Sequence, residues 1–262
     1  MIDITNIKSA FSLNIQNNGL AILREYLQYK ILQYIFQTKE SKKICFIWGT
    51  ALRIWYNNQR FSEDLDFDNF WLTEDEFENI TNYVRKNLEL EWLDVELKHI
   101  YKWTFHCHIK IPKILFENDM ASMPTQKIVI KIDTVSQNFK YIPSNKIISL
   151  LDITTSIKII DINLLLSQKI LTAFDRKRAK GRDFFDIIFI LKQTKKPNYD
   201  FLKQKLNIDN PKDLKQYILD KIIQLKLDFK FLQKDVQNFL FNPNDQSVLY
   251  FPDLIKDTEF EG

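Results

Sequence analysis

Acidic and apolar residues alternate in the segment 60–70, whose sequence is RFSEDLDFDNF. In a β-strand successive side chains point to opposite faces, so the Leu and Phe within the run would face a core while Asp64, Asp66 and Asp68 would face away from it. Carboxylates two residues apart on a strand lie roughly 6 to 7 Å apart along the backbone, a spacing that suits a shared divalent cation. Because Mg²⁺ commonly takes one or two carboxylates together with substrate phosphates, the pattern predicts phosphoryl or nucleotidyl transfer. An acidic strand face that is simply solvated is the open alternative.

A turn precedes this acidic segment. The apolar run 43–48 (KICFIW) predicts a strand that ends at Gly49 and Thr50, and the next residues, 51–56 (ALRIWY), have helical character. Backbone N–H groups and a hydroxyl at such a turn can hold phosphate oxygens, and Arg53 would lie one turn into the helix. This order of strand, Gly-Thr turn, helix and paired Asp is that of a polymerase-β-like nucleotidyltransferase.

A third carboxylate lies in the alternating segment 127–135, KIVIKIDTV, whose isoleucines predict one buried face. Polymerase-β-like enzymes usually have a third carboxylate on a neighbouring strand, where it completes the metal site or serves as base. We assign Asp133 to that role, and an exposed strand residue is the alternative. His106 and His108 share one face of an expected strand over 101–111, but no further ligands with suitable spacing favour a transition-metal site.

The remaining patterns predict an α+β protein with a mixed sheet and a helical C-terminal half. Thr73 and Glu76 have the spacing of a capping box for one of the helices. We expect a nucleotidyltransferase catalytic domain over 1–155, a helical domain over 156–262 that completes the active site, and a loosely packed tail over 242–262. The expected helices cover residues 19–36, 74–90, 162–174, 183–191 and 211–227.

The overall composition narrows the class of protein. The 262 residues include 37 basic and 34 acidic ones, and a net charge of +3 does not by itself predict polyanion binding. There are only two Cys, no apolar segment follows the first Met, and no run approaches the roughly 20 apolar residues of a membrane span. We therefore expect a cytoplasmic protein with free thiols and no membrane partner.

Two segments resemble the AbiEii family, the nucleotidyltransferase toxins of abortive-infection and toxin–antitoxin systems. Residues 46–67 (FIWGTALRIWYNNQRFSEDLDF) resemble the family's Gly-Gly-Thr-Ala-Leu-Arg turn followed by Ser-x-Asp-Leu-Asp-Phe. Residues 164–187 (LLLSQKILTAFDRKRAKGRDFFDI) resemble its C-terminal signature, a Lys on one helix, then an Arg, then Arg-Asp-x-x-Asp on the next. The two matches occur in the family's order and together span about half of the chain.

The resemblance implies a role for each matching residue. Asp64 and Asp66 match the metal-binding pair, which would hold Mg²⁺ or Mn²⁺. Lys169 matches the lysine that neutralises charge on the triphosphate, with a solvated helix face as its alternative, and Asp183 matches the first acid of the last motif. For Asp186 a structural salt bridge is as plausible as a site role. The expected nucleotide-binding residues are Gly49, Thr50, Arg53, Ser62, Lys169, Arg176 and Arg182, the two last in the basic cluster 175–182.

One residue departs from the family pattern. Trp48 stands where the family has the first glycine of its turn. Glycine permits close approach of the backbone to phosphate, whereas an indole adds bulk. Trp48 would narrow the nucleotide pocket, stack on a base, or be the last buried residue of the strand.

The resemblance also implies an activity. The enzyme would transfer a nucleoside monophosphate from an NTP to an acceptor, the 3′ end of tRNA, and would arrest growth unless an antitoxin restrained it. One alternative is a glycosyltransferase whose D-x-D holds a divalent ion, although neither the Gly-Thr turn nor the signature over 169–183 supports it. The other is a catalytically silent module that binds nucleotide or RNA, which Trp48 motivates.

Overall fold

The computed structural model describes residues 3–101 and 104–262, which form two compact units. The first unit runs to Ile159 but omits Asn58–Arg60, and the second consists of Asn58–Arg60 together with Ile160–Gly262. The chain therefore leaves the first unit for three residues, directly before the acidic residues of segment 60–70, and then returns to it. The sequence placed the domain boundary between residues 155 and 156 and did not anticipate this excursion.

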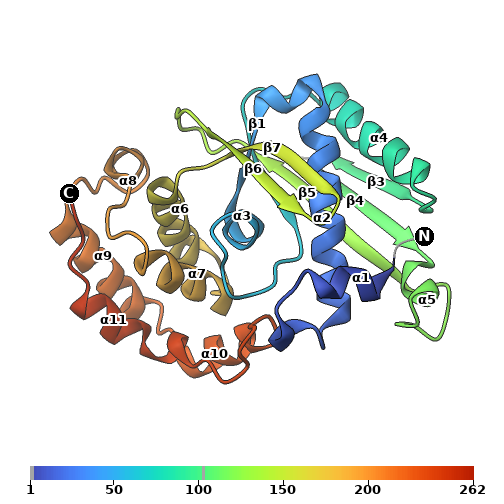
Figure 1. Cartoon of the computed structure of the whole chain (residues 1–262). Coiled ribbons are helices and arrows are strands. Elements are labelled where there is room, and N and C mark those ends of the chain that lie inside the picture. The colour runs from blue at the N-terminus through green and yellow to red at the C-terminus, as the bar shows by residue number, and fades with distance from the viewer. Residues whose placement is uncertain (1–2, 102–103) are drawn as a thin grey trace. The chain divides into compact units, whose positions relative to one another are not determined.

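The first unit contains a mixed sheet with the strand order β3-β4-β5-β2-β1-β7-β6 within the described residues (Figure 1). The pairs β2–β5 and β1–β7 are parallel and the other pairs are antiparallel. The hairpin of β6 and β7 spans the expected boundary at residue 155. Residues 156–159, which were expected to belong to the helical domain, form the end of strand β7 instead. The strands are β1 (Ile44–Ile47), β2 (Leu65–Asn69), β3 (Glu96–Tyr101), β4 (Phe105–Pro112), β5 (Lys127–Val135), β6 (Ser144–Leu150) and β7 (Ile153–Ile159).

The predicted strand over 101–111 corresponds to β4 from Phe105 onward, and residues 102 and 103 lie outside the described residues. β3, which pairs with β4, was not predicted because its burial alternates only weakly. β5 has the predicted bounds, and its isoleucines are buried as expected.

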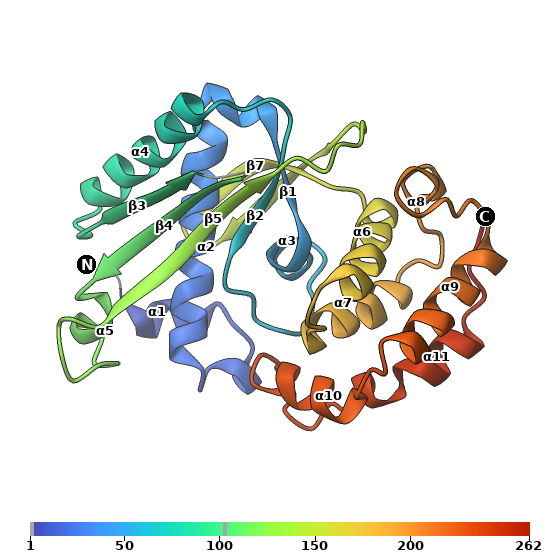
Figure 2. The same cartoon turned by 180° about the vertical axis from the view of Figure 1, so that it is seen from behind.

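One face of this sheet is covered by α2 (Gly19–Gln37) and α4 (Glu74–Leu90), as Figure 2 shows from behind. The ring of Phe67 on β2 lies 6.2 Å from that of Phe36 on α2, and the rings of Phe77 and Phe105 are 5.8 Å apart. α4 begins with the predicted capping box, in which the Thr73 hydroxyl accepts the Glu76 N–H. Apolar burial on this face leaves the opposite face of β2 and β5 for the carboxylates.

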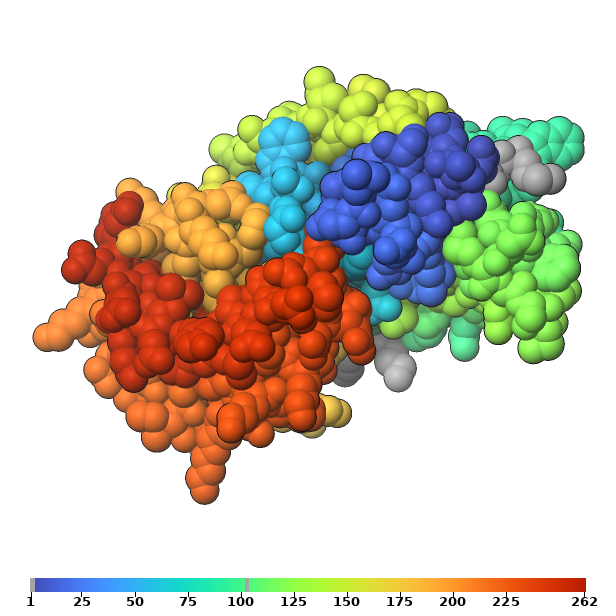
Figure 3. Space-filling view, turned by 60° about the horizontal axis from the view of Figure 1, so that its bottom comes forward, coloured from blue at the N-terminus to red at the C-terminus, as the bar shows by residue number. Residues whose placement is uncertain are grey.

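Short helices complete the first unit. The N–H of Ile4 donates to Asn118 Oδ1 at 3.3 Å, and in Figure 3 the blue N-terminal segment lies against the green segment around α5. These helices are α1 (Ile4–Ser9), α3 (Trp48–Ile54) and α5 (Ile114–Glu117), with short 3₁₀ segments at Leu13–Ile15 and Lys39–Lys43.

The second unit is helical, as predicted. Its core contains Phe184, whose ring lies 5.0 Å from that of Phe251. Because Phe251 and Ile255 are fully buried, the expectation of a loosely packed tail is wrong, and Figure 3 shows the red C-terminal helix against orange neighbours. The helices are α6 (Ile162–Asp175), α7 (Gly181–Leu191), α8 (Tyr199–Leu206), α9 (Pro211–Gln224), α10 (Phe229–Gln237) and α11 (Phe251–Asp257), with a 3₁₀ turn at Ser247–Tyr250.

Gly181 permits the close approach of α7 and α10. A Cβ at this position would lie 1.9 Å from the carbonyl oxygen of Leu232, and the Gly181 N–H donates to Asp235 Oδ2 at 2.8 Å. Since the obstacle is backbone, Gly181→Ala forces the helices apart, and we expect it to lower the free energy of unfolding by about 3 kcal/mol or more. Urea unfolding followed by circular dichroism measures this change.

Gly19→Ala is the matched control for Gly181→Ala. At Gly19 the added Cβ would meet only the flexible side chains of Lys8, at 3.3 Å, and Met120, at 3.6 Å. We expect this variant to change the free energy of unfolding by less than about 0.5 kcal/mol. Equal effects of the two substitutions would contradict the close approach of α7 and α10.

Candidate active site

The predicted metal pair lies at the start of β2. Asp64 directly precedes this strand and Asp66 is its second residue, and both side chains are half-buried. β2 and β5 run parallel, and Asp66 is the register partner of Asp133. Register partners on neighbouring strands, whose backbones lie about 4.8 Å apart, point to the same face of the sheet. Asp66 and Asp133 therefore share one face, and Asp64, two residues before Asp66, lies at its edge.

His106 on β4 extends this group. It is the register partner of Asp133, and its Nδ1 lies 2.7 Å from Asp133 Oδ1. The Nε2 atom of the same ring pairs with the Thr104 hydroxyl, so both ring nitrogens are engaged. A hydrogen bond of this kind fixes the orientation of a carboxylate. In the sequence His106 was considered only as a transition-metal ligand, because its role beside Asp133 depends on the pairing of β4 with β5.

The number and chemistry of these carboxylates decide whether they fit a metal ion. Within residues 3–101 and 104–262, no three His, Cys, Asp or Glu side chains gather into a group that could hold one. Two carboxylates on one sheet face nevertheless suit Mg²⁺, which usually takes one or two carboxylates and completes its shell with water and substrate phosphates. The donor set therefore fits a cation that arrives with its nucleotide.

Asp68 does not belong to the exposed acidic row. Its side chain is buried, and its Oδ1 accepts the Gln137 N–H at 2.9 Å. The expectation that all three aspartates of the segment form an exposed charged face is therefore wrong at Asp68. The cause is the loop after β5, which covers the C-terminal end of β2.

The predicted phosphate-holding turn forms the first turn of α3, where Gly49 and Thr50 are both buried. The Thr50 hydroxyl donates to the main-chain carbonyl of Asp64 and lies 2.8 Å from Ser62 Oγ. Both hydroxyls predicted to contact the nucleotide therefore hold the start of β2 against α3. Thr50 thus positions the carboxylate of Asp64 through its backbone.

Arg53 forms a buried ion pair with α2. Its Nε lies 3.0 Å from Glu25 Oε2, its second terminal nitrogen lies 3.0 Å from Glu25 Oε1, and it also donates to Asn57 Oδ1. Burial raises the pKa of Glu25, and the charge and hydrogen bonds of Arg53 offset part of that rise. These contacts hold α3 on α2, a positioning role that the sequence did not predict.

In the second unit, Lys169 on α6 lies between two carboxylates of α7. Its Nζ is 3.1 Å from Asp183 Oδ1 and 2.7 Å from Asp186 Oδ2. The lysine side chain is only 6% exposed, which excludes the alternative of a solvated helix face. The predicted signature thus forms a buried ionic cluster.

Asn58 and Arg60 complete this cluster from the segment that enters the second unit. Arg60 donates to both oxygens of Asp186, at 2.7 and 2.6 Å, and Asn58 donates to one of them at 2.7 Å. Burial alone would raise the pKa of Asp186, but Arg60 and Lys169 outweigh it and hold that pKa below its usual value. The role of Arg60 was not predicted from the sequence. A buried Asp needs a cationic partner, but its spacing does not say which one.

Basic residues at the start of α7 add further positive charge. Arg176 Nε lies 3.3 Å from Asp183 Oδ2, and the Arg182 guanidinium lies 4.4 Å from the centre of the Phe239 ring. Burial and the neighbouring Arg176 and Arg182 charges lower the pKa of Lys180. Arg176 lies between α6 and α7, and Arg182 is the second residue of α7. Arg60, Lys169 and Arg176 face two carboxylates, which leaves a surplus positive charge that can attract phosphate.

A comparison with protein families decides what kind of protein carries these two sites. The family described as nucleotidyl transferase AbiEii toxin, type IV toxin–antitoxin system, matches residues 30–247. The chain belongs to the AbiEii family. It is therefore a nucleotidyltransferase of a toxin–antitoxin family, as the two motif segments predicted, and the glycosyltransferase alternative is not supported.

Solved structures agree with the AbiEii assignment at the level of the fold. The crystal structure of JHP933 from Helicobacter pylori is 18% identical, with a TM-score of 0.53 and 90% of each chain covered. A second H. pylori structure, provisionally named a nucleotidyltransferase, is 18% identical with a TM-score of 0.55 and covers 90% of this chain and 93% of its own. A comparison with curated proteins finds no matching sequence. Of the helices in the described ranges, none has the length and apolar character needed to cross a bilayer.

Trp48 departs from the AbiEii turn in sequence but keeps a conformation that glycine favours. Its φ is +62°, in the left-handed region that bulky side chains rarely adopt. β1 ends at Ile47, so Trp48 is the first residue of α3 and is half-buried. The alternative that Trp48 is the last buried residue of the strand is therefore wrong. Glycine adopts this backbone conformation freely, whereas tryptophan adopts it at a cost in conformational free energy.

Two substitutions separate the backbone cost from the bulk of the indole. Trp48→Gly and Trp48→Ala remove the same ring, but only alanine keeps a Cβ. Since glycine adopts positive φ freely, we expect the Gly variant to be more stable than the Ala variant by about 1 kcal/mol. Urea unfolding of the two proteins measures the difference, and equal stabilities would contradict a left-handed backbone at this position.

Proposed function

We propose that this AbiEii protein is a Mg²⁺-dependent nucleotidyltransferase that transfers a nucleoside monophosphate from an NTP to the 3′ end of tRNA. The observation that carries the proposal is the parallel register of β2 and β5, which pairs Asp66 with Asp133 on one sheet face. In the proposed reaction the 3′ oxygen of the acceptor attacks the α-phosphorus and pyrophosphate leaves. Mn²⁺ is the alternative metal.

The proposal gives each residue of the first unit a role. Asp64 and Asp66 would hold the cation, which neutralises triphosphate charge when bound. Asp133 would be its third ligand or would accept the proton of the acceptor hydroxyl, and His106, 2.7 Å away, would orient it. Thr50 positions Asp64 through the main-chain hydrogen bond described above.

We propose further that the second unit completes the active site. Arg60, which is anchored on Asp186, precedes Asp64 by only four residues, and four residues of chain span at most about 14 Å. This covalent link between the Lys169 cluster and the segment that carries Asp64 is what supports the proposal. Lys169, Arg176 and Arg182 would then bind phosphate oxygens, with Asp183 holding the lysine in place.

The family assignment supports a biological setting for this chemistry. Type IV toxin–antitoxin membership suggests an antitoxin as a partner. We propose that the enzyme acts in the cytoplasm, where NTP and tRNA are present, and that it arrests growth, as in abortive infection, when the antitoxin does not restrain it. The catalytically silent module remains the second candidate because Trp48 brings bulk to the glycine position.

The test is the transfer of label from each α-labelled NTP into total tRNA, into other RNA and into protein. We expect label in tRNA with Mg²⁺ and none with a chelator. Label in protein alone would overturn the tRNA acceptor. No label from any NTP, in folded protein that still binds nucleotide, would favour the silent module. In that case Trp48→Gly should also give no transfer, whereas a gain of transfer would show that the indole narrows the nucleotide pocket.

A further inference from the structure

One pocket of the first unit lies at the C-terminal end of β2, beyond Asp66 along the strand. Its volume is about 610 Å³, within the usual range of ligand sites. Asp68 and Asn69 line it from the C-terminal end of β2, and the loop 136–143 lines it from the end of β5. Asn69 pairs with Ile44 at the start of β1, whereas Asp66 pairs with its end. We call this site the lysine–aromatic pocket.

Aromatic side chains form one wall of the lysine–aromatic pocket. The rings of Phe70 and Tyr141 lie 5.4 Å apart edge to face, and those of Phe139 and Tyr141 lie 6.5 Å apart in a stacked arrangement. Trp71 stands at the rim and is 80% exposed. Flat aromatic faces of this kind stack on nucleobases without a strong sequence preference.

Trp71 has a strained backbone conformation and an indole that is exposed at the rim of the pocket. Its φ is +64°, a conformation that costs free energy for a bulky residue. Asn69 Oδ1 closes the turn by accepting the Leu72 N–H at 2.7 Å. Because the indole is exposed, burial of its apolar surface does not offset the conformational free energy. Backbone strain of this kind clusters at active sites and ligand clamps, although Trp92 shows that it does not identify a binding site by itself.

The charge of the lysine–aromatic pocket favours an anion. Lys42, Lys140 and Lys158 line it, and the Lys158 ammonium donates to the Lys42 carbonyl oxygen at 3.0 Å. The one acid among the lining residues is Asp68, which is 1% exposed and accepts the Gln137 N–H. Three lysines against one buried carboxylate leave a net charge of +2, which attracts phosphate groups.

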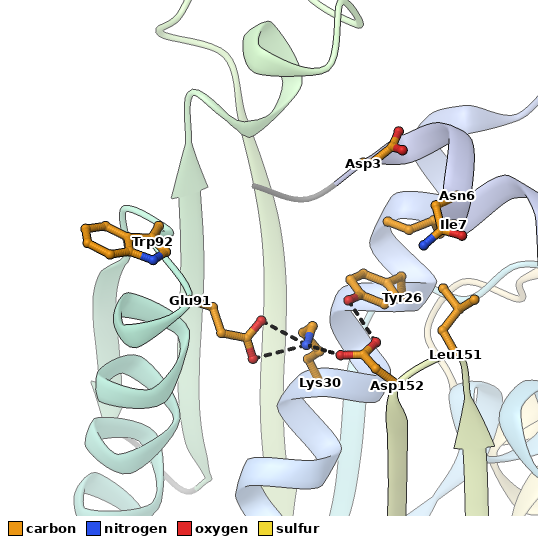
Figure 4. Close-up of a pocket in the computed structure, with 9 residues that line it drawn as sticks. All are labelled: Asp3, Asn6, Ile7, Tyr26, Lys30, Glu91, Trp92, Leu151 and Asp152. Carbon is orange, nitrogen blue, oxygen red and sulfur yellow. Dashed lines mark hydrogen bonds and ion pairs between the residues drawn. The ribbon is translucent and has the colours of Figure 1, made fainter.

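Another pocket of the same unit has the opposite charge and provides a comparison (Figure 4). Its volume is about 560 Å³, and Asp3, Glu91 and Asp152 line it together with one lysine. Lys30 lies between Glu91 Oε2, at 2.8 Å, and Asp152 Oδ2, at 3.2 Å. Trp92 at this pocket is 90% exposed and has a φ of +65°. An exposed tryptophan with positive φ thus borders each pocket, but the pocket at Trp92 is acidic and lacks the Phe70, Phe139 and Tyr141 side chains of the lysine–aromatic pocket.

We propose that the lysine–aromatic pocket binds an unpaired nucleotide of a single-stranded RNA segment. The base stacks on Trp71 and the aromatic wall, and the lysines contact the flanking phosphates. The assignment of this RNA as the acceptor strand rests on the proposed function. The pocket lies at the C-terminal end of β2, whereas Asp64 lies before its first residue. The pocket would therefore bind a nucleotide some distance along the RNA from the 3′ terminus that receives the monophosphate.

The binding of a labelled single-stranded RNA 12-mer, followed by fluorescence anisotropy, tests this proposal. We expect Trp71→Ala to weaken RNA binding by about 10-fold or more through the loss of stacking. Trp92→Ala is the matched control and should bind like the wild type, since its pocket is acidic. The double substitution Lys42→Gln and Lys140→Gln should lower the slope of log K against log salt by about 1.4, which corresponds to two phosphate contacts on a single strand.

Three outcomes would overturn the proposal. These are wild-type binding by Trp71→Ala, equal losses in Trp71→Ala and Trp92→Ala, and displacement of the RNA by a free mononucleotide at the concentration at which unlabelled 12-mer displaces it. Asp66→Asn should retain RNA binding. RNA binding is therefore measured independently of nucleotidyl transfer, and a failure to detect transfer would not contradict RNA binding by this pocket.

Discussion

Asp66→Asn is expected to lower the rate of nucleotidyl transfer by about 10³-fold or more while leaving the fold intact. The amide keeps the volume of the side chain but removes the charge that would hold a divalent cation. Metal stabilisation of transition-state charge is worth several kcal/mol, and each ~1.4 kcal/mol is a factor of ten in rate. Asp66 is half-buried and is the register partner of Asp133. Single-turnover transfer from labelled NTP measures the effect.

The control for Asp66→Asn is an aspartate outside the site. Asp75 lies exposed in the first turn of α4, and Asp75→Asn should transfer at the wild-type rate. Asp133→Asn should lower the rate as well, and His106→Gln should lower it less, because it only loosens the orientation of Asp133. Full activity of Asp66→Asn in protein with a wild-type melting temperature would refute the assignment of the metal pair.

Asp186→Asn is expected to lower the free energy of unfolding by about 3 to 5 kcal/mol. Asp186 is fully buried and accepts hydrogen bonds from Arg60 and lies 2.7 Å from Lys169 Nζ. Removal of its charge leaves two buried cations with too little compensation, and the breaking of a buried pair has this cost. Urea unfolding at neutral pH measures the change. Asp253→Asn, which breaks an exposed pair with Lys256 in the same unit, should cost less than about 1 kcal/mol.

The pH dependence of this difference gives a second measurement. The pKa of Asp186 is lowered in the folded protein, so its contribution is fully present above the unfolded pKa of about 3.9. That contribution is lost as the pH falls through the lower, folded pKa. The stability difference between the wild type and Asp186→Asn should therefore be constant from pH 7 to 5 and shrink below about pH 4. A difference that grew on acidification would contradict a lowered pKa.

Local patterns predicted much of the secondary structure correctly. The capping box at Thr73, the alternation over 127–135 and the helices of the C-terminal half appear in the structure within a few residues of their expected bounds. Each depends on interactions between residues a few positions apart, such as a cap hydrogen bond or a buried stripe. The β6–β7 hairpin was missed because its apolar residues also fit a helix-rich segment, and only its pairing with β1 distinguishes the two.

The sequence by itself determined the family and the enzyme class. The D-x-D spacing, the turn before it and the lysine signature gave the nucleotidyltransferase prediction, because residue types and short spacings suffice to specify such motifs. Tertiary structure alone decided which distant groups meet. Asp133 joins Asp66 through strand register, and Arg60 joins Asp186 across 126 residues of chain. Asp68 is buried, unlike Asp64 and Asp66, because the loop after β5 covers its side chain. Such contacts depend on how whole elements pack and on where a buried charge finds its partner, and neither is encoded in local spacing.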